Sequence, residues 1–176
     1  MMSIAYLLTG SNLGNRWQHI CDALANIGKT TGEISAISPV YQSPAWGFSH
    51  PAPFLNQAIQ LRTNFSPQDL LRLTLEIEKG MGRVRSHAGY EARNIDIDIL
   101  LYDDLVIESP ELTIPHPRMH LRRFALVPLL DINGSLIHPK LKMSMKKLLD
   151  ACPDEGKVTL FVDHNSSIQD GGIDAV

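Results

Sequence analysis

The sequence predicts an α+β domain built on one antiparallel sheet, and three observations support this class. Apolar and polar residues alternate in several short runs, as they do in half-buried strands. Two longer segments repeat their apolar residues every three to four positions, as amphipathic helices do. These runs follow one another as strand, helix, strand, strand, helix, strand. The order βαββαβ is that of a ferredoxin-like fold, with both helices on one face of the sheet.

Most elements in this order have a local signal at one end. Gly28 and Gly80 are expected to stop the two helices, and Ser66 followed by Pro67 is a strong start signal for the second. Pro39 interrupts the second strand. The predicted elements are strands at Ile4–Thr9, Glu33–Tyr41, Phe54–Leu61 and Arg93–Tyr102, with helices from Arg16 to Gly28 and from Pro67 to Lys79.

The residues after Tyr102 are predicted to form a C-terminal extension of this fold. Two Xaa-Pro steps should keep Leu112–His120 extended and stiff. Residues 1–162 are expected to form a single domain, and the polar residues 163–176 a disordered tail. The other predicted elements are a short strand at Leu105–Ile107, a helix at Arg123–Ile132 disturbed by Pro128, a helix from its cap at Ser144 through Cys152, and a strand at Val158–Val162.

Composition excludes several classes of protein. A chain of 176 residues with 44% hydrophobic and 20% charged residues can build one ordinary globular core. The net charge of −3 argues against a nucleic-acid partner, because phosphate backbones require a basic protein face. The apolar run Ile4–Leu8 is too short for a signal peptide or a membrane span. Cys21 and Cys152 are interpreted as reduced core thiols, which indicates a reducing, cytoplasmic compartment.

Two loops carry residues that regular structure does not explain. Ser43–Pro53 contains three prolines and a glycine, and its Trp46 and Phe48 are costly to expose, so the loop either packs down or covers a ligand. Gly10–Gly14 follows the first strand but lacks the Gly-Lys-Ser/Thr of a P-loop. A tight turn is therefore favoured for Gly10–Gly14 over phosphate binding.

The strand at Arg93–Tyr102 carries the main chemical signal. Since side chains alternate along a strand, Asp96 and Asp98 should share the open face, about 6.6 Å apart. Carboxylates this close repel each other, and a pair of Mg²⁺ ions about 3.5–4 Å apart would offset the repulsion. The alternative is a solvated strand face with scattered acids. The apolar residues expected to face the helices are Ile95, Ile97, Ile99 and Leu101.

Basic residues gather around this strand. Arg83, Arg85 and Arg93 lie just before Asp96, and arginine presents a fork of donors suited to phosphate oxygens. Acids that hold Mg²⁺, ringed by arginines on loops, are what a nucleoside triphosphate requires. His116, in a proline-stiffened segment, could donate to a phosphate oxygen or simply bond to backbone. The histidines show no HxH or HExxH spacing, so zinc is not expected.

Several motifs occur in order over about residues 4–150: Thr9-Gly-Ser-Asn-Leu-Gly14, Ser43-Pro-Ala-Trp-Gly47, Phe54-Leu-Asn56, Gly82-Arg-Val-Arg85, Arg93-Asn-Ile-Asp-Ile-Asp98, Ile114-Pro-His-Pro117, Arg122-Arg-Phe124 and Pro128-Leu129. In these the chain resembles the 6-hydroxymethyl-7,8-dihydropterin pyrophosphokinases of folate biosynthesis. The resemblance implies a ferredoxin-like fold. It also implies transfer of the diphosphate of ATP to the hydroxymethyl group of the pterin, with release of AMP.

The resemblance further implies a role for individual residues. Arg83, Arg93, Asp96 and Asp98 would be catalytic, and the two aspartates would hold two Mg²⁺ ions. The implied ATP-binding residues are Glu78, Arg83, Arg85, Arg93, Ile99, Thr113, His116 and Arg122. The implied pterin-binding residues are Ser43, Pro44, Trp46, Phe54, Asn56, Asp96 and Phe124, with the two phenylalanines sandwiching the flat ring.

Four positions depart from the family pattern. Ala92 replaces the usual proline and Tyr90 a common tryptophan, so the rigidity and closure of that loop should differ. Leu75 stands where some members have glutamine and Glu111 where some have a basic residue, which affects the adenine side.

Two other functions are weighed against this one. A palm-type nucleotidyltransferase or cyclase would release pyrophosphate rather than AMP, and an RNA-recognition module would need an aromatic-basic strand motif that the chain lacks. The expected partners are therefore small molecules, with no membrane and no nucleic acid, for a monomer or at most a weak dimer.

Overall fold

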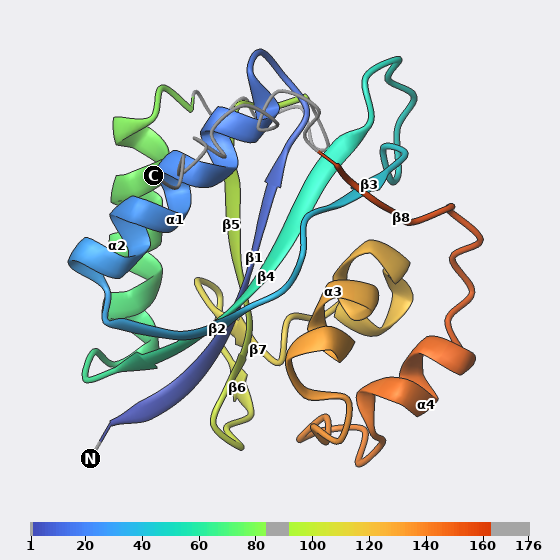
Figure 1. Ribbon diagram of the computed structural model, residues 1–176. Helices are drawn as coiled ribbons and strands as arrows, with labels where there is room; N and C mark the ends of the chain where they lie inside the picture. Colours follow the sequence, from blue (N-terminus) through green and yellow to red (C-terminus); the bar gives the residue numbers. More distant parts are fainter. Residues whose placement is uncertain (1, 84–91, 163–176) are drawn as a thin grey trace, which may run out of the picture.

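The computed structural model describes residues 2–83 and 92–162. The βαββαβ order and the ferredoxin-like α+β class are confirmed (Figure 1). The elements are β1 (Ser3–Ser11), α1 (Arg16–Thr30), β2 (Glu33–Ile37), β3 (Tyr41–Ser43), β4 (Phe54–Thr63), α2 (Pro67–Gly80), β5 (Asp96–Tyr102), β6 (Ile107–Glu108), β7 (Thr113–Ile114), the 3₁₀ helix η1 (Met119–Leu121), α3 (Arg123–Asn133), α4 (Met145–Asp150) and β8 (Thr159–Leu160).

The main sheet has the strand order β5-β1-β4-β3-β8, and β2 also pairs with β4. Every pairing in it is antiparallel. The predicted second strand, Glu33–Tyr41, is in fact two strands, β2 and β3, because the chain leaves the ladder around Pro39. The long central strand β1 pairs on one side with β4 and on the other with β5, so residues of all three strands lie side by side at the end near Gly10.

Helices α1 and α2 cover one face of the sheet, as predicted (Figure 1). The side chain of Ser66 accepts a hydrogen bond from the amide of Asp69, and α2 ends at Gly80, so both predicted signals are confirmed. Gly28 does not stop α1, which continues to Thr30. A β-carbon at position 28 would lie 3.3 Å from Cδ1 of Ile34, so the glycine lets α1 pack closely on β2.

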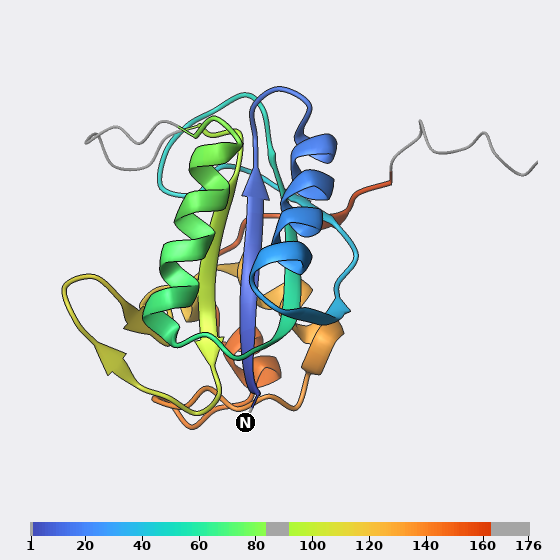
Figure 2. The same cartoon turned by 90° about the vertical axis from the view of Figure 1, so that its left-hand side faces the viewer.

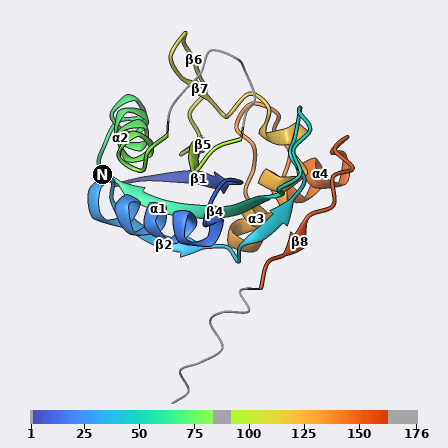
Figure 3. The same cartoon turned by 90° about the horizontal axis from the view of Figure 1, so that it is seen from above.

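The opposite face of the sheet is not open along its whole length, contrary to the prediction. Figures 1 and 3 show α3 and α4 on this side, so that the sheet lies between two layers of helices. A second apolar cluster fills the space between the sheet and these helices. Its buried residues are Tyr6, Leu8, Ala58, Leu100, Leu101, Met119, Ala125, Leu126, Leu129, Met145 and Leu148.

A bulge in β5 explains why Leu101 belongs to this second cluster instead of the predicted helix-side core. Tyr6 pairs with Leu101 and the next residue of β1, Leu7, pairs with Ile99, so Leu100 is an extra residue. An extra residue reverses the alternation of side chains beyond it. Ile99 therefore packs under α1 and α2, whereas Leu101 packs under α3.

The C-terminal half differs in detail from its prediction. The short strand β6 lies at Ile107–Glu108 and pairs with β7 in a separate hairpin, which projects from the domain in Figure 2. The predicted extended segment Leu112–His120 is extended only to Ile114, after which the chain turns into η1. Ser144 caps α4 as predicted, but α4 ends at Asp150, and β8 is only two residues long.

No helix in the described ranges 2–83 and 92–162 is both long and apolar enough to span a bilayer. Cys21 and Cys152 are half-buried and form no disulfide within the described residues, and their reduced state stays a prediction. The expected tail at 163–176 lies outside the described residues, so its disorder stays a prediction.

Candidate active site

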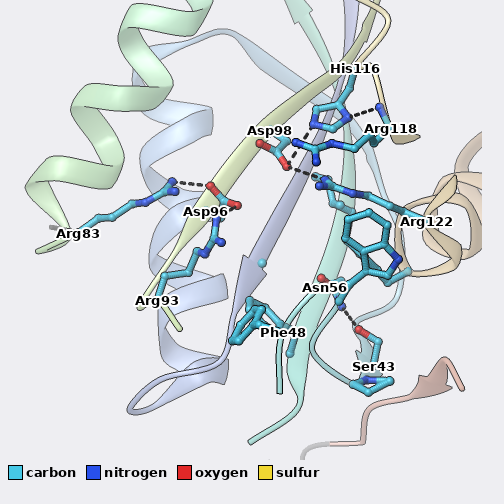
Figure 4. Close-up of a pocket in the computed structure, with 16 residues that line it drawn as sticks. Ser43, Phe48, Asn56, Arg83, Arg93, Asp96, Asp98, His116, Arg118 and Arg122 are labelled. Atoms are coloured by element: carbon cyan, nitrogen blue, oxygen red, sulfur yellow. Dashed lines mark hydrogen bonds and ion pairs between the residues drawn. The ribbon is translucent and has the colours of Figure 1, made fainter. Parts of the chain in front are cut away.

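The part of the sheet that α3 and α4 leave uncovered forms the floor of a cavity of about 240 Å³. Gly10 on β1 pairs with Asn56 on β4 and with Asp96 on β5, so these three residues cross the floor in one row. A β-carbon at Gly10 would lie 3.4 Å from Oδ1 of Asn56, so the absence of a side chain at this position leaves space above the floor of the cavity. The lining residues are Leu8, Gly10, Ser43, Pro44, Trp46, Phe48, Phe54, Asn56, Arg83, Arg93, Asp96, Asp98, His116, Arg118, Arg122 and Phe124 (Figure 4).

Asp96 lies between two arginines that come from the ends of the loop before β5 (Figure 4). Arg83 forms an ion pair with Oδ1 of Asp96, and Nη1 of Arg93 lies 2.5 Å from Oδ2. The same Arg83 guanidinium is 2.5 Å from Oε1 of Glu78. Burial alone would lower the pKa of Arg83, but the charges of Asp96 and Glu78 outweigh it and raise that pKa.

Glu78 lies behind Arg83 and does not line the cavity. Its side chain is only 2% exposed, and Oε1 accepts a hydrogen bond of 2.8 Å from the backbone amide of Ile97. Glu78 belongs to the last turn of α2, so this bond ties the end of that helix to the start of β5. The structure thus gives Glu78 the geometry of a residue that holds Arg83 and β5 in place.

Asp98 faces the same cavity as Asp96 but has looser partners. Its Oδ2 lies 3.8 Å from Nη1 of Arg122 and 4.0 Å from Nε2 of His116. Burial, followed by the negative charge of Asp96, raises the pKa of Asp98 to about 7. The two carboxylates predicted to share one strand face do so, and they repel each other as expected.

His116 is fixed by its backbone and is neutral at pH 7. Its amide donates a hydrogen bond of 2.9 Å to the carbonyl of Leu100, and its Nδ1 accepts one of 3.2 Å from the amide of Arg118. Burial, with the charges of Arg122 and Arg118, lowers the pKa of His116 to about 4. The ring accepts a backbone hydrogen bond, as one of the two interpretations predicts, and it also faces the cavity, so a contact with phosphate stays a prediction.

The other half of the cavity is aromatic. Phe48 meets Phe54 edge to face with 6.2 Å between ring centres, and the guanidinium of Arg122 lies 4.8 Å from the ring centre of Trp46 and 5.6 Å from that of Phe124. Asn56 is buried in this half and donates a hydrogen bond of 2.9 Å to the hydroxyl of Ser43. Rings with one amide on the floor suit a flat heterocycle that carries polar atoms on its edge.

The structure brings together twelve of the predicted site residues in this one cavity. They are Ser43, Pro44, Trp46, Phe54, Asn56, Arg83, Arg93, Asp96, Asp98, His116, Arg122 and Phe124. Three predicted ATP contacts do not line it: Glu78 lies behind Arg83, the side chain of Ile99 lies in the helix-side core, and Thr113 lies in β7. These three contacts stay predictions. Arg85 and Tyr90 lie outside the described residues.

Three further residues contribute to the site without a specific signal in the sequence. Phe48 and Arg118 line the cavity, and the position of Arg118 directly after the Pro-His-Pro segment is the signal that could have found it. Asn12 is the third. Its Oδ1 accepts a hydrogen bond of 2.8 Å from the amide of Arg93, and its own amide donates one of 3.1 Å to the carbonyl of Arg93. The loop at Gly10–Gly14 thus holds the backbone of a site arginine.

The donor set around Asp96 and Asp98 fits Mg²⁺. Within residues 2–83 and 92–162 there is no group of three or more His, Cys, Asp and Glu side chains that could hold a metal. Mg²⁺ is commonly bound by one or two carboxylates, with water and substrate phosphates as its other ligands. Two carboxylates on one strand face, one of them with a raised pKa, are such a pair.

Fold and site together define a ferredoxin-like enzyme whose cavity joins an acidic and arginine-rich half to an aromatic half. Residues 6–134 match the family described as 7,8-dihydro-6-hydroxymethylpterin-pyrophosphokinase (HPPK). The match covers most of the chain, and the chain belongs to this family.

Curated relatives agree with this assignment. The 2-amino-4-hydroxy-6-hydroxymethyldihydropteridine pyrophosphokinase of Porphyromonas gingivalis is 42% identical over 142 residues, which are 79% of this chain and 96% of the relative. The enzyme of the same name from Aquifex aeolicus is 40% identical over 146 residues, 83% of this chain and 90% of the relative.

Solved structures show the same fold at low identity. The wild-type HPPK-DHPS of Plasmodium falciparum superposes with a TM-score of 0.69 at 16% identity, over 86% of this chain. The chain spans 45% of that longer protein, so this likeness concerns the fold of one part of it.

Proposed function

We propose that this chain transfers the diphosphate of ATP to the hydroxymethyl oxygen of 6-hydroxymethyl-7,8-dihydropterin, which gives AMP and the pterin diphosphate used in folate synthesis. The observation that carries the proposal is the single cavity that places Asp96 and Asp98 beside arginines at one end and aromatic rings at the other. Family membership and the names of relatives about 40% identical support the same reaction.

The charged half of the cavity would bind the triphosphate. Asp96 and Asp98 would hold two Mg²⁺ ions, whose charge would neutralise the polyphosphate during transfer. Arg83 and Arg93 are within reach of this centre, since both already contact Asp96. Arg122 and the neutral His116, which lie on the far side of Asp98, would donate hydrogen bonds to phosphate oxygens.

Arginine contacts with Asp96 must change when the acid holds a cation. In the structure two guanidinium groups balance the charge of Asp96. A cation on Asp96 would free both groups to turn toward phosphate, and Glu78 would keep hold of Arg83 from behind. The metal ions and the arginines would then together stabilise the negative charge that develops as the pterin oxygen attacks the β-phosphorus in line.

The aromatic half would bind the pterin. Phe54 and Phe124 would hold the two faces of the ring, and Asn56 would bond to its edge from the floor of the cavity. The backbone of Ser43, Pro44 and Trp46 would supply further polar contacts along the rim. Asp96, which lies beside Gly10 on the same floor, would be near the hydroxymethyl group.

The test is the nucleotide product formed from MgATP with and without the reduced hydroxymethylpterin. AMP together with pterin diphosphate, formed only when both substrates are present, is the expected result. Release of pyrophosphate would instead favour a nucleotidyltransferase or cyclase, and no pterin-dependent turnover would overturn the proposal.

Further features of the protein follow from the same proposal. Residues 1–162 would act as one domain, and the protein would work as a monomer or at most a weak dimer. The compartment would be the reducing cytoplasm, where thiols such as Cys21 and Cys152 stay reduced. Sedimentation of the full chain at micromolar concentration tests the oligomeric state, and a stable dimer would contradict it.

A further inference from the structure

The segment from Cys152 to Phe161, here called the C-terminal strap, runs from α4 past the start of α3 to the edge of the sheet (Figures 1 and 3). It lies beyond residues 6–134, which match the family pattern. Along its first part half-buried residues alternate with exposed ones, although most of these residues are in no regular element. The half-buried residues are Cys152, Asp154, Gly156 and Val158.

Asp154 binds the first turn of α3. Its Oδ2 accepts a hydrogen bond of 2.9 Å from the backbone amide of Arg123, the first residue of that helix. The cap residue Arg122 makes no side-chain cap hydrogen bond, and the first turn contains no acidic residue. A carboxylate at a helix N-terminus satisfies an otherwise unpaired amide and interacts favourably with the helix dipole. Asp154 therefore supplies the capping carboxylate of α3 from 31 positions away in the chain.

The residues on either side of Arg123 belong to the cavity. Trp46 and Phe124 line the aromatic half, and Arg122 lies between the two halves, in contact with both rings and 3.8 Å from Asp98. A hydrogen bond to the amide of Arg123 thus fixes the backbone from which Arg122 and Phe124 both project.

The strap also contacts the loop on the other side of the aromatic half. Gly156 donates a hydrogen bond of 2.9 Å to Oδ1 of Asp154, and a β-carbon at position 156 would lie 3.5 Å from Cγ of Pro44. A small space of about 20 Å³ is lined jointly by the strap, by Phe124 and by residues of the loop after β3. Further on, β8 pairs with β3, and the amide of Phe161 donates a hydrogen bond of 2.8 Å to the carbonyl of Val40.

We propose that Asp154 is a positioning residue for the pterin site: through the strap it holds the start of α3 against the loop after β3, and so sets the affinity for the pterin. The inference rests on the proposed function, since it concerns the same cavity. Asp154 does not line the main cavity, and it acts through Phe124 and Arg122. The other groups of the charged half are held by β5 and α2 instead, so affinity for MgATP should depend on Asp154 only weakly, through Arg122.

The experiment compares three variants of the full chain: Asp154→Ala, Asp154→Asn and the control Glu155→Ala. Glu155 is the exposed neighbour of Asp154 and has the same charge, so it controls for a general effect of lost charge. Steady-state kinetics give kcat and the KM of each substrate, and fluorescence titration gives pterin binding in the presence of a non-hydrolysable ATP analogue. Thermal unfolding is recorded for every variant.

Asp154→Ala should raise the KM and the dissociation constant for the pterin about fivefold to thirtyfold, which corresponds to about 1–2 kcal/mol, the upper part of the range for loss of a helix cap. Its kcat and KM for MgATP should change by less than about twofold. Asp154→Asn should be intermediate, because its single carbonyl oxygen can replace one of the two acceptor oxygens. Glu155→Ala should behave as wild type.

Two results would overturn the inference while leaving the proposed function intact. One is an active wild type with unchanged pterin affinity in Asp154→Ala. The other is an equal loss of affinity for the pterin and for MgATP, together with a lowered unfolding temperature in both Asp154 variants. That result would mean a merely structural role. A wild type that neither binds the pterin nor forms AMP would overturn the proposed function and this inference with it.

Discussion

The two halves of the cavity are held in place by different means. In the charged half, Asp96 and Asp98 project from one strand and are surrounded by ion pairs and hydrogen bonds to α2 and to the loop after β1. In the aromatic half, the rings come from the loop after β3, from β4 and from α3, and they are held by packing. The charged half is therefore held by ion pairs and hydrogen bonds around one strand, whereas the aromatic half is held by packing between elements that are distant in the chain.

This difference suggests that the two halves affect different kinetic constants. Charged groups that act on a phosphoryl group in the transition state affect kcat, because their interactions strengthen as charge develops. Rings that bind the pterin equally in the ground state and the transition state affect mainly KM. Substitutions in the two halves should therefore be distinguishable by kinetics.

The largest effect is expected for Asp96→Asn. Loss of this charge removes a predicted metal ligand and leaves Arg83 and Arg93 without the carboxylate they share, so kcat should fall about 10³-fold or more. Circular dichroism should show an intact fold, and the exposed Asp104→Asn on the turn after β5 is the control. A variant that kept a tenth or more of wild-type turnover would remove Asp96 from the catalytic centre.

Phe54→Ala and Phe124→Ala test the aromatic half. Each should raise the pterin KM about fivefold to 150-fold, the range for loss of one stacked ring, with a smaller change in kcat. The KM for MgATP should stay within about twofold. Phe65→Ala, at a ring outside the cavity, is the matched control. Equal increases in the KM values of the pterin and of MgATP would contradict the proposed division between the two halves.

Glu78→Gln tests how the charged half is supported from behind. Glutamine can still accept the hydrogen bond from Ile97 but cannot balance the charge of Arg83. We expect kcat to fall about tenfold, with a pterin KM close to wild type. Glu76→Gln, at an exposed position of the same helix, is the control, and the idea fails if both glutamine variants behave alike.

The smallest effect on activity is expected at His138, which does not line the cavity. This residue is buried beside His120, and burial is the first cause that lowers the pKa of His138 to about 4. Because 4 lies below the ordinary value of 6.5, the unfolded state takes up the proton first as pH falls. The stability that neutral His138 contributes is complete above pH 6.5 and is lost as pH falls toward 4.

Between pH 7 and pH 4.5 the free energy of unfolding should fall by about 1–2 kcal/mol less in His138→Asn than in the wild type. Asparagine keeps an acceptor for the amide of Leu141 but does not titrate. Urea unfolding at pH 7 and at pH 4.5, with kcat measured at pH 7, checks both parts. The titratable neighbours that act on His138 are His120 and Lys140, and both are kept in the variant. If the variant loses as much unfolding free energy at pH 4.5 as the wild type, other titrating groups cause the acid destabilisation.

Much of the fold could be predicted because its signals are local. The cap at Ser66 and the alternation up to Ile99 depend only on neighbouring residues, and both agree with the structure. The predictions failed where packing overrides a local signal. Gly28 allows close contact with Ile34 instead of ending α1, and the bulge at Leu100 turns Leu101 to the other face.

The sequence by itself determined that Asp96 and Asp98 share one face of a strand, since the pleat of a strand fixes the direction of alternate side chains. It also placed arginines next to them along the chain. Only the tertiary structure decided that α3 covers part of that face, that Glu78 supports Arg83, and that Asp154 reaches the start of α3. These contacts join residues brought together by the packing of helices on a twisted sheet, and no local pattern records that packing.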